Sequence, residues 1–145
     1  MDQSATVIAI YYYDGYFYLP ACVRSLAGLL SITEPITIIP VNDRAALAEE
    51  IELKAAAGNA TLSNADFRAA SENSLQAAMH LPNRLAFLTK TRRWSLVEEN
   101  GAYTLIPFKP APLRGVVEDM EQAIVLDPAT FAIEASELLH AQLGQ

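Results

Sequence analysis

The chain has 145 residues, which is long enough for one domain and short for two. Hydrophobic residues make up 52% of it and charged residues 19%, a balance that excludes an intrinsically disordered protein. The net charge of −7 repels phosphate backbones and anionic headgroups, so we expect neither a nucleic acid nor a membrane as partner. Cys22 has no second cysteine to pair with, which favours a reducing cytoplasm.

The first predicted element is a β-hairpin. Residues 6–13 and 16–23 are rich in β-branched and aromatic side chains, and Asp14-Gly15 between them is typical of a two-residue turn. Two further apolar stretches, 26–32 and 36–41, predict strand segments. Because prolines at 35 and 40 remove backbone donors, we expect the second stretch to lie at a sheet edge or to begin at a bulge.

Helices are predicted in the middle of the chain. Asn42 or Asp43 caps a first helix, which Gly58 ends. A second helix is expected to start after Ser63 or Asn64 and to run towards Pro82, and a short third one to span residues 83–88.

A second hairpin follows, because Asn100-Gly101 separates apolar residues 94–99 and 102–108. Its turn predicts the cross-strand pairs Leu96–Leu105 and Val97–Thr104.

The C-terminal third contains fewer clear signals. Prolines at 107, 110 and 112 are expected to break regular structure, and a strand is expected at 123–126. Asp127-Pro128 predicts the start of a last helix, ended by Gly144. Together the elements predict one α+β domain over residues 1–145, with a mostly antiparallel sheet built from two hairpins and helices packed on it.

Residues that carry chemistry are few. The chain has two histidines, no phosphate-cradling glycine loop and no metal-ligand cluster, so we expect no enzyme, no cofactor and no metal. The first hairpin is rich in tyrosines, which suit either a protein interface or packing of a helix on the sheet. Lys90, Arg92 and Arg93 form a small basic group, for which internal ion pairs are the ordinary role.

Several of these signposts together resemble a known family. They are the hairpin sequence YDGYFYLP at residues 13–20, Glu34-Pro35 before an apolar strand, a helical middle, and residues 85–88 with Lys90 leading to Trp94 before a hairpin. This pattern spans about Tyr11 to Pro128 and resembles the immunity proteins of contact-dependent growth inhibition systems.

The resemblance implies a protein that binds and neutralises, in the cytoplasm, the C-terminal toxin domain of a cognate exported effector. Many such toxins are nucleases, which hold phosphate backbones on cationic surfaces. From Trp94 to the end, eight acids accompany two bases, so this region suits a basic partner. The residues predicted to face the toxin are Glu98, Glu99, Tyr103, Glu118, Asp119 and Glu121.

Two alternatives stay open. One is an adaptor or subunit that binds an unrelated protein, which sequence does not distinguish from an immunity protein. The other is a small enzyme that uses Cys22 or His140, which requires a concave site joining either residue to a carboxylate.

Overall fold

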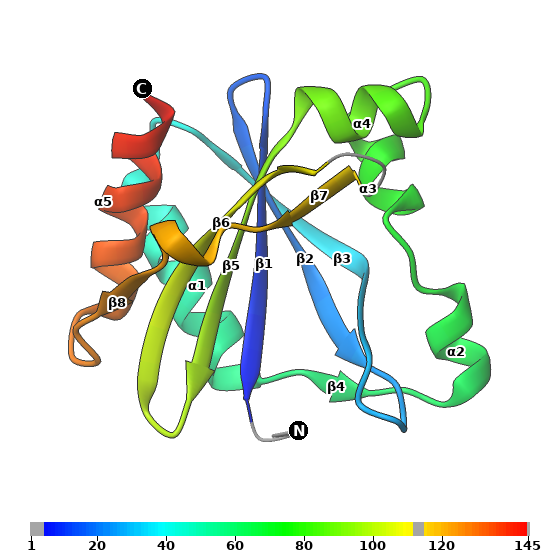
Figure 1. Ribbon diagram of the computed structural model, residues 1–145, viewed down its shortest axis with the longest axis horizontal. Helices are drawn as coiled ribbons and strands as arrows, with labels where there is room; N and C mark the ends of the chain where they lie inside the picture. The colour runs from blue at the N-terminus through cyan, green and yellow to red at the C-terminus, as the bar shows by residue number, and fades with distance from the viewer. Residues whose placement is uncertain (1–4, 112–114, 145) are drawn as a thin grey trace.

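The first hairpin forms as predicted. In the computed structural model, which describes residues 5–111 and 115–144, β1 (Thr6–Tyr13) and β2 (Tyr16–Arg24) pair in antiparallel around Asp14-Gly15 (Figure 1). The φ angles of Asp14 and Gly15 are 48° and 90°, the left-handed values that a type I′ turn needs.

The second hairpin also forms as predicted, from β5 (Arg92–Glu99) and β6 (Ala102–Ala111). The cross-strand pairs Leu96–Leu105 and Val97–Thr104 are confirmed. The two hairpins join through a long antiparallel pairing of β1 with β5, which runs from Thr6 opposite Glu98 to Tyr12 opposite Arg92.

A sheet of eight strands results, with the order β3-β2-β1-β5-β6-β7. β3 (Leu30–Pro40) forms one edge, while β7 (Gly115–Glu118) and β8 (Ile124–Leu126) both pair with the outer side of β6 at the other. The short β4 (Ala60–Thr61) pairs in parallel with the end of β2. The predicted α+β class with a mostly antiparallel sheet is therefore confirmed.

Helices cover both faces of the sheet, but not equally (Figure 1). On one face, α1 (Arg44–Ala57) and α5 (Phe131–Leu143) pack on Ile8, Ile10 and Trp94. On the other, α3 (Asn73–Ala78) and α4 (Arg84–Lys90) pack on Ala9 and Tyr11. Successive residues of a strand point to opposite faces, which explains why β1 is apolar at every position of its centre.

Asn59 bridges β1 and β2 where these two strands separate. β1 and β2 pair only through Tyr11–Tyr18, Tyr12–Phe17 and Tyr13–Tyr16. The next hydrogen-bonded pair in this register places Ala9 opposite Pro20, which has no N–H to donate. Beyond it, the side-chain amide of Asn59 fills the gap. Its Oδ1 accepts from the N–H of Val7 at 2.8 Å, and its Nδ2 donates to the carbonyls of Val7 at 2.8 Å and Cys22 at 3.1 Å.

The region around β3 differs from the expectation of two strand segments. Residues 25–29 form a loop closed by a hydrogen bond from the Ser25 N–H to the Leu29 carbonyl at 2.8 Å. β3 then runs unbroken past the cis Glu34–Pro35 bond. Its place at the sheet edge and a register shift opposite Pro20 and Ala21 confirm the expected edge and bulge.

The helical middle is more divided than predicted. α1 is capped by Asp43 and ended by Gly58, as expected. The single helix predicted after Ser63 is wrong, because the chain leaves helical geometry at Ala70, whose ψ is 130°. It forms α2 (Asn64–Ala69) and then α3, and α4 follows Asn83 as predicted.

The C-terminal third contains more strand than predicted. β6 continues through Pro107 and Pro110, so the expected break there is wrong; Pro112 lies outside the described residues. Pro107 is tolerated because it lies between the β8 and β7 ladders, where its carbonyl accepts from the Asp119 N–H at 2.7 Å.

Two corrections concern the elements after Pro110. β7 and the 3₁₀ turn η1 (Met120–Gln122) were not predicted. α5 starts after Thr130 rather than at Asp127-Pro128, although Gly144 ends it as expected. Among the described residues, no helix combines the length and apolar character that crossing a bilayer requires.

We predict that Asn59→Ala lowers the free energy of unfolding by about 2–3 kcal/mol, since it leaves strand groups of Val7 and Cys22 without partners. Urea denaturation followed by circular dichroism measures this. Asn64→Ala, at an exposed position of α2, is the matched control and should change stability little. Equal effects of the two substitutions contradict a bridging role for Asn59.

Candidate functional site

One group of predicted residues lies at the end of the β5–β6 hairpin. Glu98 is directly opposite Tyr103, and its Oε2 accepts from the Gly101 N–H at 2.9 Å. The Tyr103 ring stacks on Phe131 of α5, with centroids 3.9 Å apart, and Glu99 is exposed beside it. The structure therefore brings these three predicted residues together at the end of the hairpin, with Glu98 and Tyr103 on the face that α5 covers and Glu99 on the other.

The other group lies where β7 passes into η1. Asp119 forms an ion pair with Lys109 at 3.7 Å, and Glu121 is exposed. Glu118 lies opposite Phe108 and faces the other side of the sheet from Tyr103. Tyr103 and Phe108 are five residues apart on β6, so roughly 17 Å separates the two groups at about 3.4 Å per residue.

Both groups nevertheless belong to one edge of the sheet, because β7 and β8 flank the same side of β6. Between them, Met120 is 60% exposed and Val125 is 75% exposed. We call this surface the acidic edge. It is formed around Met120 and Val125 by Glu98, Glu99, Glu118, Asp119, Glu121 and Asp127.

The sequence analysis missed Met120, Val125 and Asp127 as members of this surface. Alternation in the predicted strand 123–126 does contain the signal for Val125. Ile124 and Leu126 pack against the core under α5, so Val125 points the other way. Met120 lies in η1, which no sequence pattern indicated.

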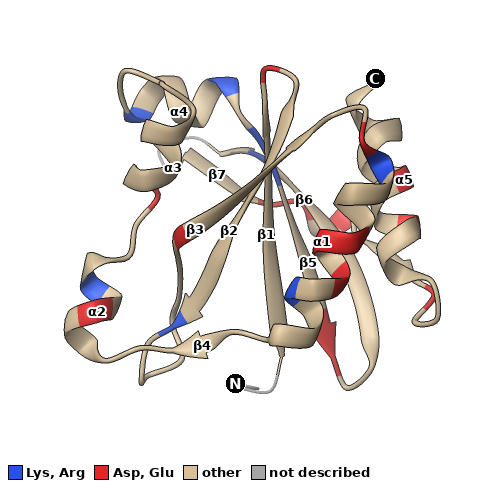
Figure 2. Ribbon diagram, turned by 180° about the vertical axis from the view of Figure 1, so that it is seen from behind, with Lys and Arg blue, Asp and Glu red and all other residues tan. Residues whose placement is uncertain are grey.

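Charge is unevenly distributed over the rest of the molecule (Figure 2). Acidic residues mark α1, α5 and the β5–β6 hairpin, whereas α4 and the start of β5 carry basic residues.

Two members of the predicted basic group, Arg92 and Arg93, lie on opposite faces of the sheet. Arg92 lies over the Trp94 ring at 5.2 Å and donates to the Gln142 carbonyl at 2.8 Å, while Arg93 points to the opposite face.

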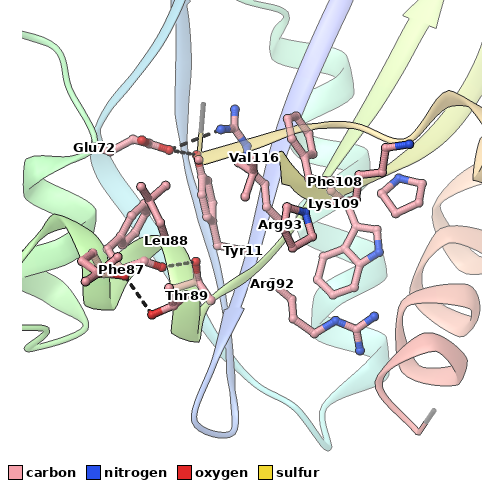
Figure 3. A pocket seen from close by; sticks show the side chains of 16 residues that line it. Tyr11, Glu72, Phe87, Leu88, Thr89, Arg92, Arg93, Phe108, Lys109 and Val116 are labelled. Atoms are coloured by element: carbon pink, nitrogen blue, oxygen red, sulfur yellow. Dashed lines mark hydrogen bonds and ion pairs between the residues drawn. The ribbon is translucent and has the colours of Figure 1, made fainter. Parts of the chain in front are cut away.

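Arg93 is the centre of a second candidate site. Its guanidinium carbon lies 4.2 Å from the centroid of Phe108 and 5.1 Å from that of Tyr11. Glu72, just before α3, accepts from the Tyr11 hydroxyl at 2.6 Å and pairs with Arg93 at 3.4 Å (Figure 3). It also pairs with Arg84 at 2.5 Å. This cluster ties the helical layer to the sheet.

Two hollows adjoin this cluster. A cleft of about 500 Å³, here called the Arg93 cleft, lies between α4 and the β6–β7 pair (Figure 3). An open-face groove of about 710 Å³ continues from it over the uncovered part of the sheet, where β1 and β2 have separated. Tyr11, Glu72, Arg93 and Phe108 border both hollows.

Cys22 and His140, the two residues that the enzyme alternative could use, lie on opposite faces of the sheet. Cys22 lines the open-face groove, and burial raises the pKa of its thiol, while nearby Arg93 lowers it less. His140 lies on the opposite face, between the carbonyls of Ser136 at 2.6 Å and Val41 at 2.5 Å, and packs on Phe17. The structure therefore does not join the thiol to this imidazole, although two carboxylates, Glu72 and Glu118, line the same groove as Cys22.

Metal ligands do not gather either. Within residues 5–111 and 115–144, no three His, Cys, Asp or Glu side chains form a group that could hold an ion. His80, at the end of α3, is exposed.

The tyrosines of the first hairpin mostly serve packing. Tyr11 is buried, and Tyr12 packs edge-on against Phe17 and accepts from the Gly15 N–H at 3.1 Å. Tyr16 is the one that the structure leaves well exposed, at 45%. For Tyr11 and Tyr12, contacts within the molecule therefore account for both the ring and the hydroxyl, as the packing interpretation expects.

Among the solved structures that the fold resembles is that of a protein of unknown function. That protein of unknown function, from Neisseria meningitidis, is similar over 94% of this chain and 92% of that chain, with a TM-score of 0.71 and 14% sequence identity. At this identity the similarity shows the fold alone. Comparisons with protein-family models and with curated proteins give no match.

We predict that Tyr11→Phe lowers the free energy of unfolding by about 1–3 kcal/mol at neutral pH, because Glu72 loses its 2.6 Å donor. Tyr13→Phe is the control. Urea denaturation of both variants and the parent protein measures the difference, and a loss in Tyr13→Phe equal to that in Tyr11→Phe contradicts the prediction.

Tyr11→Phe also changes how the free energy of unfolding depends on pH in the alkaline range. Burial raises the pKa of Tyr11 well above its usual value of 10.0, Arg93 lowers it, and Glu72 raises it. The folded state holds the proton of the Tyr11 hydroxyl more tightly than the unfolded state does. The contribution of this hydroxyl to the free energy of unfolding is therefore complete below about pH 10 and is lost as the pH rises towards the pKa of the folded state. Tyr11→Phe should therefore lose less stability than the parent protein between about pH 9 and pH 11.

Proposed function

We propose that this protein is an immunity protein, which binds and neutralises in the cytoplasm the toxin domain of a contact-dependent growth inhibition effector. The proposal combines the resemblance of the Tyr-rich hairpin and its following signposts with the net charge of −7. The partner is a basic domain, and a nuclease fits this description because it must hold a polyanion.

The acidic edge is the observation that carries the proposal. Protein interfaces combine an apolar centre, which supplies most of the affinity, with a polar rim. Met120 and Val125 supply exposed apolar area at the middle of this edge, and carboxylates lie on both sides of them. Such an arrangement steers a cationic partner by charge and holds it by apolar contact.

The ion pair between Lys109 and Asp119 does not cancel this field. Lys109 is 51% exposed, and the 3.7 Å separation makes the pair a weak surface contact. Glu118 and Glu121 carry further negative charge beside it. The edge therefore remains negative towards an approaching partner.

An adaptor for an unrelated protein stays the alternative, and one experiment separates the two. The protein is co-expressed with the C-terminal domain encoded by the adjacent upstream open reading frame. An immunity protein restores growth of cells that express this domain and co-purifies with it. A complex without growth rescue supports the adaptor, and the absence of both overturns the immunity proposal.

Removing charge from the acidic edge should weaken the complex. For the triple variant Glu118→Gln, Asp119→Asn, Glu121→Gln, we expect affinity to fall by about tenfold or more at about 50 mM salt and less at about 200 mM, since screening removes steering. Surface plasmon resonance at the two salt concentrations measures both effects.

The matched control removes three charges elsewhere, by Glu34→Gln, Glu52→Gln and Asp66→Asn. Glu34 lies on β3, at the opposite edge of the sheet, and the other two lie on helices. We expect its affinity to stay within about twofold of the parent protein. Equal losses in the two triple variants show that only net charge matters and contradict the assignment of this edge.

A further inference from the structure

We propose that the Arg93 cleft binds a carboxylate carried on an apolar body. The inference is independent of the proposed function, because it rests on a cavity whose lining includes none of the residues of the acidic edge. The cleft lies between α4 and β7, and its volume of about 500 Å³ falls within the range of small-molecule sites.

Arg93 supplies the group that recognises the anion. A guanidinium has five N–H donors. The Nη1 of Arg93 has one long contact, 3.4 Å, to Glu72, and its buried Nε has no acceptor among the described residues. The Arg93 side chain is 28% exposed although its Nε is buried, so a ligand that supplies acceptor oxygens reaches this guanidinium through its Nη groups.

Glu72 does not neutralise the cluster. Its shorter contacts are with the Tyr11 hydroxyl at 2.6 Å and with Arg84 at 2.5 Å. Two guanidinium groups therefore share one carboxylate, which leaves the cluster of Glu72, Arg84 and Arg93 with an excess of one positive charge. Lys109 and Arg92 also line the cleft, but Lys109 already pairs with Asp119 and Arg92 donates to the Gln142 carbonyl. A single carboxylate on the ligand matches the excess of the cluster.

Rings hold the Arg93 guanidinium in place before any ligand arrives. Phe108 and Tyr11 both lie against it, at 4.2 Å and 5.1 Å from the guanidinium carbon. Restricting the side chain in advance reduces the entropy that binding costs. The planar edge of arginine also suits the two oxygens of a carboxylate.

Apolar side chains form most of the remaining walls, beside Thr89, Thr91, Arg92 and Lys109, and they determine the body of the ligand. Phe87 and Leu88 of α4 face Phe108 and Val116 of the β6–β7 pair across the cleft (Figure 3). At one end the walls approach closely, because a Cβ on Gly115 would lie 3.2 Å from a methyl group of Leu88. An aromatic or aliphatic chain fits these walls, whereas a hydrophilic ligand does not.

The charge of the whole protein favours a monoanion over a polyanion. The net charge of −7 repels nucleic acids and other polyphosphates at long range, while the excess on the Glu72, Arg84 and Arg93 cluster is a single positive charge. An apolar carboxylate has two sources with the same chemistry, a free small molecule and the C-terminus of a peptide that ends in an apolar residue.

Isothermal titration calorimetry with matched ligand pairs tests the inference. The first pair is 4-phenylbutyrate and its uncharged amide, and the second is the peptide Gly-Gly-Leu-Phe with a free or an amidated C-terminus. We expect at least one acid to bind about tenfold or more tightly than its amide. Binding of the phenylbutyrate alone indicates a free small molecule, and binding of the peptide acid indicates a chain terminus.

Variants then locate the site. Val116→Phe fills the cleft and should abolish binding, whereas Val117→Phe, on the same strand with its side chain on the opposite face, should leave affinity within about twofold. Arg93→Gln should weaken the acid by about tenfold and the amide little, and Arg68→Gln on α2 is its control.

Several results overturn the inference. They are equal affinity for acid and amide, no binding of either acid in the millimolar range, and competition by inorganic phosphate as strong as by the acid. Because Arg93→Gln leaves Glu72 with one fewer partner, thermal unfolding checks its fold. If it unfolds, the Val116→Phe and Val117→Phe pair decides alone, and equal binding by those two variants overturns the site.

Discussion

The side-chain amide of Asn59 takes the place of a neighbouring strand where β1 and β2 separate. The backbone of β1 therefore stays hydrogen-bonded there, while β2 departs towards the β3 edge of the sheet. Pro20 ends the β1–β2 ladder, and without a substitute the N–H and carbonyl of Val7 would face no partner. The Asn59 amide supplies both an acceptor and a donor, as a neighbouring strand does. Through its other edge, β1 pairs with β5 from Thr6 to Tyr12, which joins the two hairpins into one sheet.

This separation also explains why the two faces of the sheet differ. α1 and α5 form a closed layer on one face, with Leu47, Ile51 and Leu139 fully buried. On the other face α3 and α4 cover only the end near the first turn, and Glu72 attaches this layer to Tyr11 and Arg93. The uncovered remainder becomes the open-face groove and the Arg93 cleft. A cluster of partly exposed charges thus lies where hydrophobic packing stops.

Local chemistry was predictable from the sequence, and contacts between distant segments were not. Asp14-Gly15 and Asn100-Gly101 determine their turns by themselves, so both hairpins and the Leu96–Leu105 pair followed. Pro107 looked like a breaker because the gap between β7 and β8 that accommodates it forms only in the folded sheet. The pairing of Glu72 with Arg93 spans 21 residues, and no spacing rule covers it. The acids of residues 98–121 were found by composition, but their division along β6 depends on the register of β7 and β8.

The two proposals meet at β7 and yet use different side chains. Glu118 belongs to the acidic edge, whereas Val116 lines the Arg93 cleft, and Phe108, opposite Glu118, touches the Arg93 guanidinium. Loss of charge at Glu118 therefore leaves the cleft intact, and filling the cleft at Val116 leaves the carboxylates of the edge in place. Because a ligand and a partner protein would both contact the same short strand, any coupling between them must be reciprocal, and each would change the affinity of the other by the same factor.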